Sequence, residues 1–130
     1  MIVVDSSALI AIYFNEPEKA SFALAVVSVD APCIGAPNFL EASMVAETRH
    51  GEAGCRELDR IAANLGLEIV PFDASHIQGA RDALRRFGKG RHRASLNFGD
   101  CCAYALAKLR DVPLLFKGND FALTDLKRAL

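Results

Sequence analysis

The stretch Ile2-Val3-Val4-Asp5-Ser6-Ser7-Ala8-Leu9-Ile10 sets the fold of this chain. Its first three residues are β-branched and apolar without interruption, which predicts a short strand that is buried on both faces. Asp5 ends this run, and residues 6–14 then show the apolar spacing of a helix. A buried strand that passes directly into a helix is typical of a parallel α/β fold.

The same alternation continues along the chain. Further short apolar runs predict strands at residues 33–36, 67–72 and 112–116. Helical patterns occupy residues 15–30, 38–50, 52–64, 75–87, 99–110 and 123–130, and Gly51 ends the one at 38–50. We therefore expect one α/β domain over residues 1–130, with a mostly parallel sheet of four or five strands and helices on both faces.

Composition narrows the class of protein. Hydrophobic residues make up 52% of the chain and charged residues 24%, which is ordinary for a globular domain. The longest apolar run, residues 101–107, is far shorter than a membrane span of about 20 residues. The N-terminus has no basic region of the signal-peptide type. We expect a cytoplasmic protein without membrane contact, in which Cys33, Cys55, Cys101 and Cys102 are free thiols.

The net charge of −1 conceals an uneven distribution. Arg85, Arg86, Lys89, Arg91 and Arg93 lie in one short segment without an acidic residue. The rest of the chain therefore holds 10 of the 15 basic residues against all 16 acidic ones. This excludes attraction to nucleic acid over the whole surface, but it leaves two interpretations of the basic segment, a local phosphate contact or a solvated loop.

Four acidic residues stand where the predicted fold would bring them together. Asp5 follows the first strand and Asp120 follows the last, and ligands of open parallel sheets bind at this carboxyl edge. Glu41 and Asp100 lie in the first turns of two helices. Carboxylates that converge repel each other unless a cation neutralises them, and Mg²⁺ prefers oxygen ligands. A divalent metal site suited to phosphodiester hydrolysis is one interpretation of this pattern.

Each acid also has a purely structural interpretation. Asp5 could cap the helix that begins at Ser6, and Asn38 with Glu41 fits a capping box. Asp100 could complement the dipole of its helix, and Asp120 could be a turn residue. Spacing alone leaves both interpretations open.

Four motifs carry a resemblance to a known family. They are Ile2-Val3-Val4-Asp5-Ser6-Ser7-Ala8, Ala36-Pro37-Asn38-Phe39-Leu40-Glu41-Ala42, Leu96-Asn97-Phe98-Gly99-Asp100-Cys101-Cys102 and Leu114-Leu115-Phe116-Lys117-Gly118-Asn119-Asp120. In order and spacing they resemble the acidic motifs of PIN-domain proteins, specifically the VapC type of toxin from bacterial toxin–antitoxin pairs. The likeness extends over essentially the whole chain.

The resemblance implies a Mg²⁺- or Mn²⁺-dependent endoribonuclease. Asp5 and Asp100 would be the principal metal ligands, Glu41 would support them, and Asp120 would complete the cluster. Relatives often have an acid where this chain has Asn119, so either Asn119 or Asp120 could face the metal.

The resemblance also implies contacts around the site. The Ser6 hydroxyl would touch a ligand or a metal-bound water, although it could equally cap its helix. Apart from the resemblance, Lys89, Arg91 and Arg93 lie just before the third motif, where they could reach RNA phosphates or form a solvated loop. The partners it implies are a VapB-like antitoxin whose C-terminal segment covers the active site, and a second copy of the chain in a homodimer.

Two other functions compete with this one. Asp5, Asp73 and Lys117 imitate the acidic pocket and lysine of a signalling receiver domain that is phosphorylated at Asp73, although such domains need an acid pair where this chain has Asp5-Ser6. The other alternative is a PIN-like scaffold that has lost catalysis.

Overall fold

A computed structural model describes residues 1–130 and shows a four-stranded, entirely parallel sheet with the strand order β3-β2-β1-β4. The strands are β1 (Val3–Val4), β2 (Cys33–Gly35), β3 (Glu68–Val70) and β4 (Leu114–Leu115). Five helices accompany them: α1 (Ser6–Tyr13), α2 (Lys19–Val27), α3 (Ala36–Asn64), α4 (Ala74–Phe87) and α5 (Phe98–Arg110). The predicted α/β fold is confirmed.

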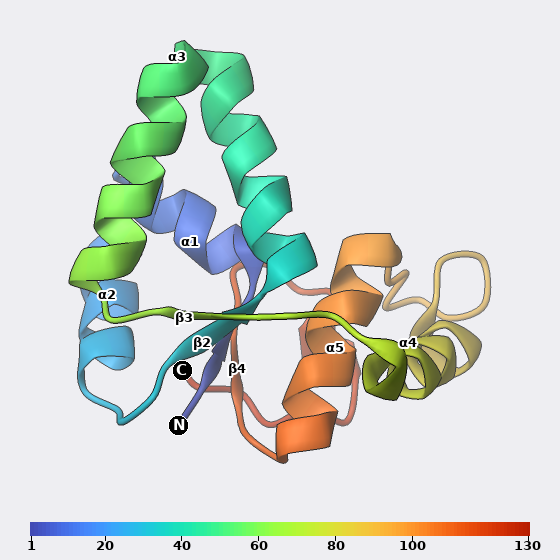
Figure 1. Ribbon diagram of the computed structural model, residues 1–130. Helices are drawn as coiled ribbons and strands as arrows, with labels where there is room; N and C mark the ends of the chain where they lie inside the picture. Colours follow the sequence, from blue (N-terminus) through green and yellow to red (C-terminus); the bar gives the residue numbers. More distant parts are fainter.

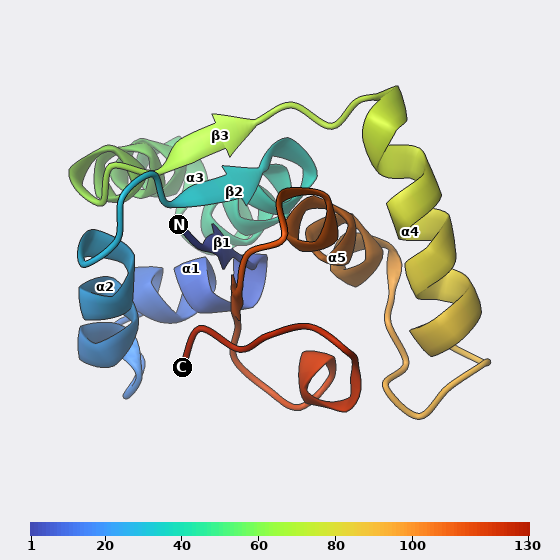
Figure 2. The same cartoon turned by 90° about the horizontal axis from the view of Figure 1, so that it is seen from below.

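Alternation along the strands divides the core into two layers. Val3, Cys33 and Leu114 face one layer, which α4 and α5 cover. Their neighbours Val4 and Ile34, with Leu115, face the other layer, which α1, α2 and α3 cover. Figures 1 and 2 show the helices on the two faces of the sheet. Burial on both faces explains why β1, β2 and β4 contain no charged residue, whereas the edge strand β3 exposes Glu68 and Ile69.

The order of the strands fixes where a site can form. The chain passes from β1 to β2 to β3 in one direction and then places β4 on the other side of β1. Segments that leave the carboxyl ends of β1 and β4 therefore diverge to opposite sides, and a crevice opens between them. Asp5 follows β1 directly at this point.

Helix α3 differs from the prediction of two separate helices. It runs from Ala36 to Asn64, and only Gly51 leaves the helical conformation, with φ of 69°. A positive φ favours glycine, so the kink falls where the sequence predicted the first helix to end. The two halves form an arm that rises above the sheet (Figure 1).

The predicted helix at residues 123–130 is wrong. The structure has a short 3₁₀ helix, η1 (Phe121–Leu123), followed by an extended segment beside β4. The Leu114 amide donates to the Lys127 carbonyl, and the Ala129 amide donates to the Leu114 carbonyl. The free edge of β4 supplies the hydrogen-bond partners of these backbone groups. A helix over residues 123–130 would have been too short to be stable by itself.

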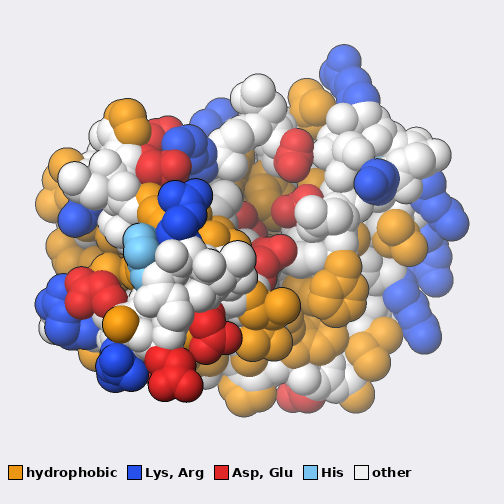
Figure 3. Space-filling view, turned by 90° about the horizontal axis from the view of Figure 1, so that it is seen from above, with side chains coloured by type: hydrophobic (Ala, Val, Ile, Leu, Met, Phe, Trp, Pro, Cys, Tyr) orange, Lys and Arg blue, Asp and Glu red, His pale blue; other side chains and the backbone are white.

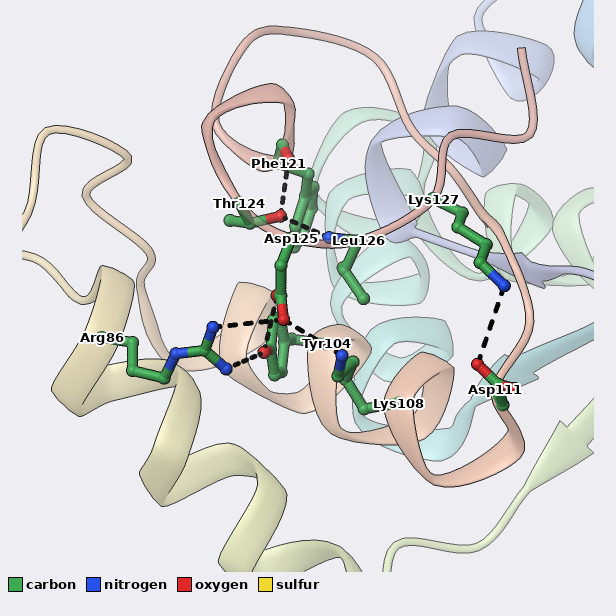
Figure 4. Close-up of polar contacts among 9 residues, drawn as sticks. All are labelled: Arg86, Tyr104, Lys108, Asp111, Phe121, Thr124, Asp125, Leu126 and Lys127. Atoms are coloured by element: carbon green, nitrogen blue, oxygen red, sulfur yellow. Dashed lines mark hydrogen bonds and ion pairs between the residues drawn. The ribbon is translucent and has the colours of Figure 1, made fainter.

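Side chains of α4 and α5 hold this C-terminal segment (Figure 4). The Asp125 carboxylate accepts hydrogen bonds from Tyr104 at 2.8 Å, Lys108 at 3.0 Å and Arg86 at 3.2 Å. Tyr104 is 2% exposed, so its hydroxyl depends on this acceptor. The segment that carries Asp120 is therefore tied to the helix that carries Asp100.

The four cysteines are free thiols, as predicted, and Cys55 is only half-buried. No helix has both the length and the hydropathy that crossing a membrane requires.

Candidate active site

The structure brings the four acidic residues together above the carboxyl edge of the sheet. Burial raises the pKa of both Asp5 and Asp100, and neighbouring charges add to it, those of Asp100 and Glu41 at Asp5 and those of Asp120 and Glu41 at Asp100. In the space-filling view, acidic side chains gather in a hollow near the middle of this face (Figure 3). Proximity follows from the topology, because α1, α3 and the segment after β4 each leave a parallel strand at this edge. The hydrogen bond from Asn38 to the Gly99 carbonyl brings the first turn of α5 to the same edge.

Asp5 is the buried centre of the site, with 3% of its surface exposed. Its Oδ2 accepts hydrogen bonds from the Ser7 hydroxyl at 2.6 Å and the Ser7 amide at 3.0 Å, so Asp5 caps α1. Its Oδ1 is buried and has no hydrogen-bond partner. Burial raises the pKa of this carboxyl from 3.8 to about 6, against the lowering effect of Ser7. Capping of α1 uses only Oδ2, so it does not explain why Oδ1 is buried without a hydrogen-bond donor.

Glu41 reaches the site from the second turn of α3. The predicted capping box with Asn38 is wrong, because the helix begins at Ala36 and its cap is Gly35. The Glu41 carboxylate instead accepts a hydrogen bond from the Ser6 hydroxyl. Asn38 is 1% exposed and donates to the Gly99 carbonyl at 2.9 Å, which ties α3 to the first turn of α5.

Asp100 stands in the first turn of α5. Its Oδ2 accepts a hydrogen bond from the Asn97 amide, and the Asn97 side chain accepts one from the Asp100 amide, so the pair forms a capping box. Burial and the neighbouring carboxylates raise its pKa. Asp100 is thus an acidic residue in the first turn of α5, where it complements the helix dipole, and it still belongs to the acidic cluster, so the two interpretations of the sequence are compatible.

Gly99 lies against the Glu41 carboxylate, and its lack of a side chain leaves space for that group. A Cβ at this position would lie 3.0 Å from both Oε1 and Oε2 of Glu41. The backbone of α5 thus passes against the Glu41 carboxylate, which sequence reasoning did not anticipate. A glycine directly before the acid of the third motif was the available signal.

Asp120 and Asn119 are both exposed in the segment after β4. Asp120 precedes η1, and its side chain makes no capping hydrogen bond. Its charge raises the pKa of Asp100, which places it beside the cluster. The choice between Asn119 and Asp120 as the fourth group stays a prediction in favour of Asp120.

Ser7 is a residue that sequence reasoning missed. Its hydroxyl donates to Asp5, and it also accepts a hydrogen bond of 3.0 Å from the Lys117 amide. Ser7 therefore links the buried acid after β1 with the segment after β4 that carries Asp120. The signal was its position two residues after an acidic N-cap.

The basic residues Lys89, Arg91 and Arg93 are exposed in the loop between α4 and α5. None of the three forms an ion pair within the chain. The Lys89 amide bonds to the Leu96 carbonyl at 2.9 Å, which closes the loop just before α5. The loop thus lies next to the helix that carries Asp100, and its contact with RNA stays a prediction.

The donor set suits a hard divalent cation, although the side chains are not assembled around one. As they stand, no three His, Cys, Asp or Glu side chains share a position that could hold a metal ion. The buried, unpartnered Asp5 Oδ1 nevertheless requires either a proton or a cation as its partner. The charges of Asp100 and Glu41 reach Asp5, and the charge of Asp120 reaches Asp100.

The groups of a receiver domain are not brought together. Strand β3, which precedes Asp73, is separated from β1 by β2. The Asp73 side chain caps α4 by accepting from the Ser75 amide. Lys117 forms ion pairs with Glu16 and Glu18. The structure therefore does not form the pocket of Asp5, Asp73 and Lys117 that a receiver domain would require.

Comparison with known proteins yields consistent matches. The family model described as PIN domain matches residues 2–127. The Ribonuclease VapC of Mycolicibacterium smegmatis is 47% identical over 124 residues, which are 95% of this chain and 96% of that protein. Among solved structures, Mycobacterium tuberculosis VapC20, described as a Sarcin-Ricin loop cleaving toxin, has a TM-score of 0.77 at 14% identity and covers 97% of this chain and 96% of its own. A toxin–antitoxin complex from Klebsiella pneumoniae has a TM-score of 0.69 at 19% identity, with coverage of 96% and 93%.

Proposed function

Because this chain belongs to the PIN domain family and is of the VapC type, we propose that it is the toxin of a toxin–antitoxin pair and a metal-dependent endoribonuclease. The single observation that carries metal dependence is the Asp5 carboxylate, which is buried with one oxygen unpartnered among three further acids. A cation there would neutralise charges that otherwise oppose each other.

We propose Mg²⁺ or Mn²⁺ as the cofactor, since both accept oxygen ligands. Asp5 and Asp100 would be the principal ligands, with Glu41 and Asp120 in support. When bound, the ion would polarise the phosphate and lower the pKa of a water for attack.

The chain's own residues prepare this chemistry. Ser7 orients the Asp5 carboxylate from one side, and the buried wall of the crevice excludes water from it. Ser6 fixes the Glu41 carboxylate, and Asn97 fixes that of Asp100. These contacts hold the carboxylates in place before substrate arrives, so little reorganisation is needed during the reaction.

We also propose an antitoxin as protein partner. An apolar groove of about 610 Å³ follows α3 beside Glu41 and is lined in part by Leu40, Met44 and Val45. Leu40 and Met44 are 59% and 60% exposed, which is unusual for neighbouring apolar residues on one helix face. A segment lying there would cover the acidic site.

The direct test of the nuclease is cleavage of total RNA by purified, antitoxin-free protein with Mg²⁺, with Mn²⁺ and with chelator. Asp100→Asn should abolish cleavage. Asp111→Asn is the matched control, because Asp111 caps the opposite end of α5 with a side chain that is 91% exposed. Discrete fragments that need both metal and Asp100 would support the proposal. A folded protein that cuts no RNA under any condition would favour the scaffold alternative.

The partner proposal has a separate test. Co-purification with the cognate antitoxin should be lost when Leu40 and Met44 are both changed to Glu. Leu24→Glu is the control, since Leu24 is 65% exposed on α2, away from the acids. Retained binding by the double variant would contradict the groove along α3 as the antitoxin site. Whether the chain forms a homodimer and resides in the cytoplasm stays a prediction.

A further inference from the structure

Phe98 is an aromatic side chain that the core does not use. It is the first residue of α5, two positions before Asp100, and it is 81% exposed. Its side chain lines the groove along α3 on one side and a second apolar groove on the other. An exposed aromatic ring at the margin of a nucleic-acid-cleaving site offers a surface on which a base can stack.

The second groove, between α4 and α5, has the lining that unpaired bases require. It measures about 530 Å³, and its apolar residues include Ile77, Leu84 and Leu96. Ile77 and Leu84 are each 42% exposed. No carboxylate lines this groove. Bases that leave a helical stack could therefore lie here without meeting negative charge.

Two cations on the margin of this groove are free to bind phosphate. Arg81 and Lys89 line it, and neither forms an ion pair within the chain. Their neighbours on α4 differ, because Arg85 pairs with Asp82 and Arg86 pairs with Asp125. Figure 3 shows hydrophobic side chains beside the acidic hollow and Lys and Arg side chains along the outer edge on this side.

We propose that a single-stranded segment of the RNA substrate occupies this groove, with one base stacked on Phe98 and its phosphates on Arg81 and Lys89. The inference rests on the proposed nuclease function and adds the position of the strand beside the cleaved bond. The strand continues toward Arg91 and Arg93 in the basic loop. A stacked base adds affinity without strong sequence preference, and the phosphate contacts make binding depend on salt.

A partner protein with an acidic, amphipathic helix is the other occupant that this lining would accept. The two differ in what they need from position 98. A helix packs against any large apolar side chain, whereas stacking requires an aromatic ring. The position of the groove favours RNA, because Asn97 and Phe98 line it and directly precede the acidic site at Asp100.

The test uses the absence of tryptophan from the chain. The Phe98→Trp variant carries a single indole, whose fluorescence a stacked base should quench. The probe is a mixed-sequence single-stranded RNA of eight nucleotides at low salt with chelator, so that binding is measured without cleavage. The same oligomer built from abasic units controls for phosphate contact alone. We expect quenching by the RNA and none by the abasic chain.

Affinity for the same probe completes the test. Phe98→Leu keeps an apolar side chain but should bind the RNA about tenfold or more weakly, while Phe98→Trp should bind it as the unchanged protein does. Arg81→Ala and Lys89→Ala should each reduce the magnitude of the salt slope by about 0.7. Leu109→Ala is the control, being 55% exposed at the far end of α5.

The outcomes separate this inference from the nuclease proposal. If the unchanged protein cleaves RNA but Phe98→Leu binds the probe with the same affinity, the stacking site is wrong and the nuclease proposal stands. An unquenched indole, or a protein that does not bind the probe, would also overturn it. Loss of antitoxin binding by Ile77→Glu, together with unchanged RNA affinity for Phe98→Leu, would assign the groove to the protein partner instead.

Discussion

The Ser7 hydroxyl donates a 2.6 Å hydrogen bond to the Asp5 carboxylate, and both side chains lie at the carboxyl edge of the central strand. The same hydroxyl accepts from the Lys117 amide at the edge of β4. One small side chain thus connects the buried acid with the segment that carries the fourth acid. This relationship makes Ser7 a positioning residue.

Ser7→Ala should lower RNA cleavage by about 10- to 100-fold, the usual cost of losing a group that orients a ligand. Because the hydroxyl lowers the pKa of Asp5, its loss should also move the acidic limb of the pH–rate profile upward. The measurement is the pH–rate profile with saturating metal. Ser28→Ala, which loses only a hydroxyl contact to the Leu24 carbonyl, is the control and should leave the profile unchanged.

Asp5 makes metal-free stability depend on pH. Its pKa is raised from 3.8 to about 6, so the folded state holds the proton more tightly than the unfolded state. The contribution of Asp5 to the free energy of unfolding is therefore largest below about pH 4, and it is lost as the pH rises through about 6. Such a difference in pKa corresponds to about 3 kcal/mol.

Asp5→Asn should consequently be more stable than the unchanged protein at pH 8 in chelator, by up to about 3 kcal/mol. The advantage should disappear at pH 4. Urea unfolding at both values measures it. A variant that is less stable at pH 8 would mean that capping of α1 outweighs the burial of charge.

Binding of Mn²⁺ should raise the melting temperature of the unchanged protein by several degrees at saturation, because the ion binds the folded state selectively. Asp5→Asn and Asp100→Asn should each lose most of this increase. Scanning calorimetry with and without Mn²⁺ measures it. Equal increases in all three proteins would place any bound metal away from the acidic cluster.

Gly99→Ala should separate activity from stability. The added methyl group meets the end of the flexible Glu41 side chain, which can move aside, and alanine favours the helix by about 0.5–1 kcal/mol. We expect unchanged or slightly higher stability and at least a tenfold loss of cleavage. Gly88→Ala provides the contrast, since its Cβ would lie 2.3 Å from the Leu84 carbonyl oxygen and should impair folding itself.

Asp125→Ala should destabilise the protein by about 2–3 kcal/mol, because it leaves the buried Tyr104 hydroxyl without an acceptor. Combining it with Tyr104→Phe should recover part of this cost in a double-mutant cycle. Lys127→Ala is the control, as its pair with Asp111 is exposed and 3.9 Å long. Additive costs in the cycle would show that the two groups are not coupled.

Local patterns in the sequence determined the elements, because an uninterrupted apolar run suits a strand buried on both faces and apolar periodicity suits a helix. The stretch from Ile2 to Ile10 predicted β1 and α1 in this way, and the four motifs predicted the family. The helix prediction at residues 123–130 was wrong because it also relied on local pattern. The pairing of that segment with Leu114 is a long-range contact that no local pattern contains.

Only the tertiary structure decided how the acids are held. From the sequence each of them had a purely structural interpretation, and Asp5 does cap α1 while Asp100 takes part in the capping box of α5. What makes them a site is the burial of Asp5 and the approach of Ser7, Gly99 and Asp120 from separate elements. Desolvation and the repulsion between carboxylates depend on distances between segments that are remote in the chain, and the strand order brings those segments to one edge.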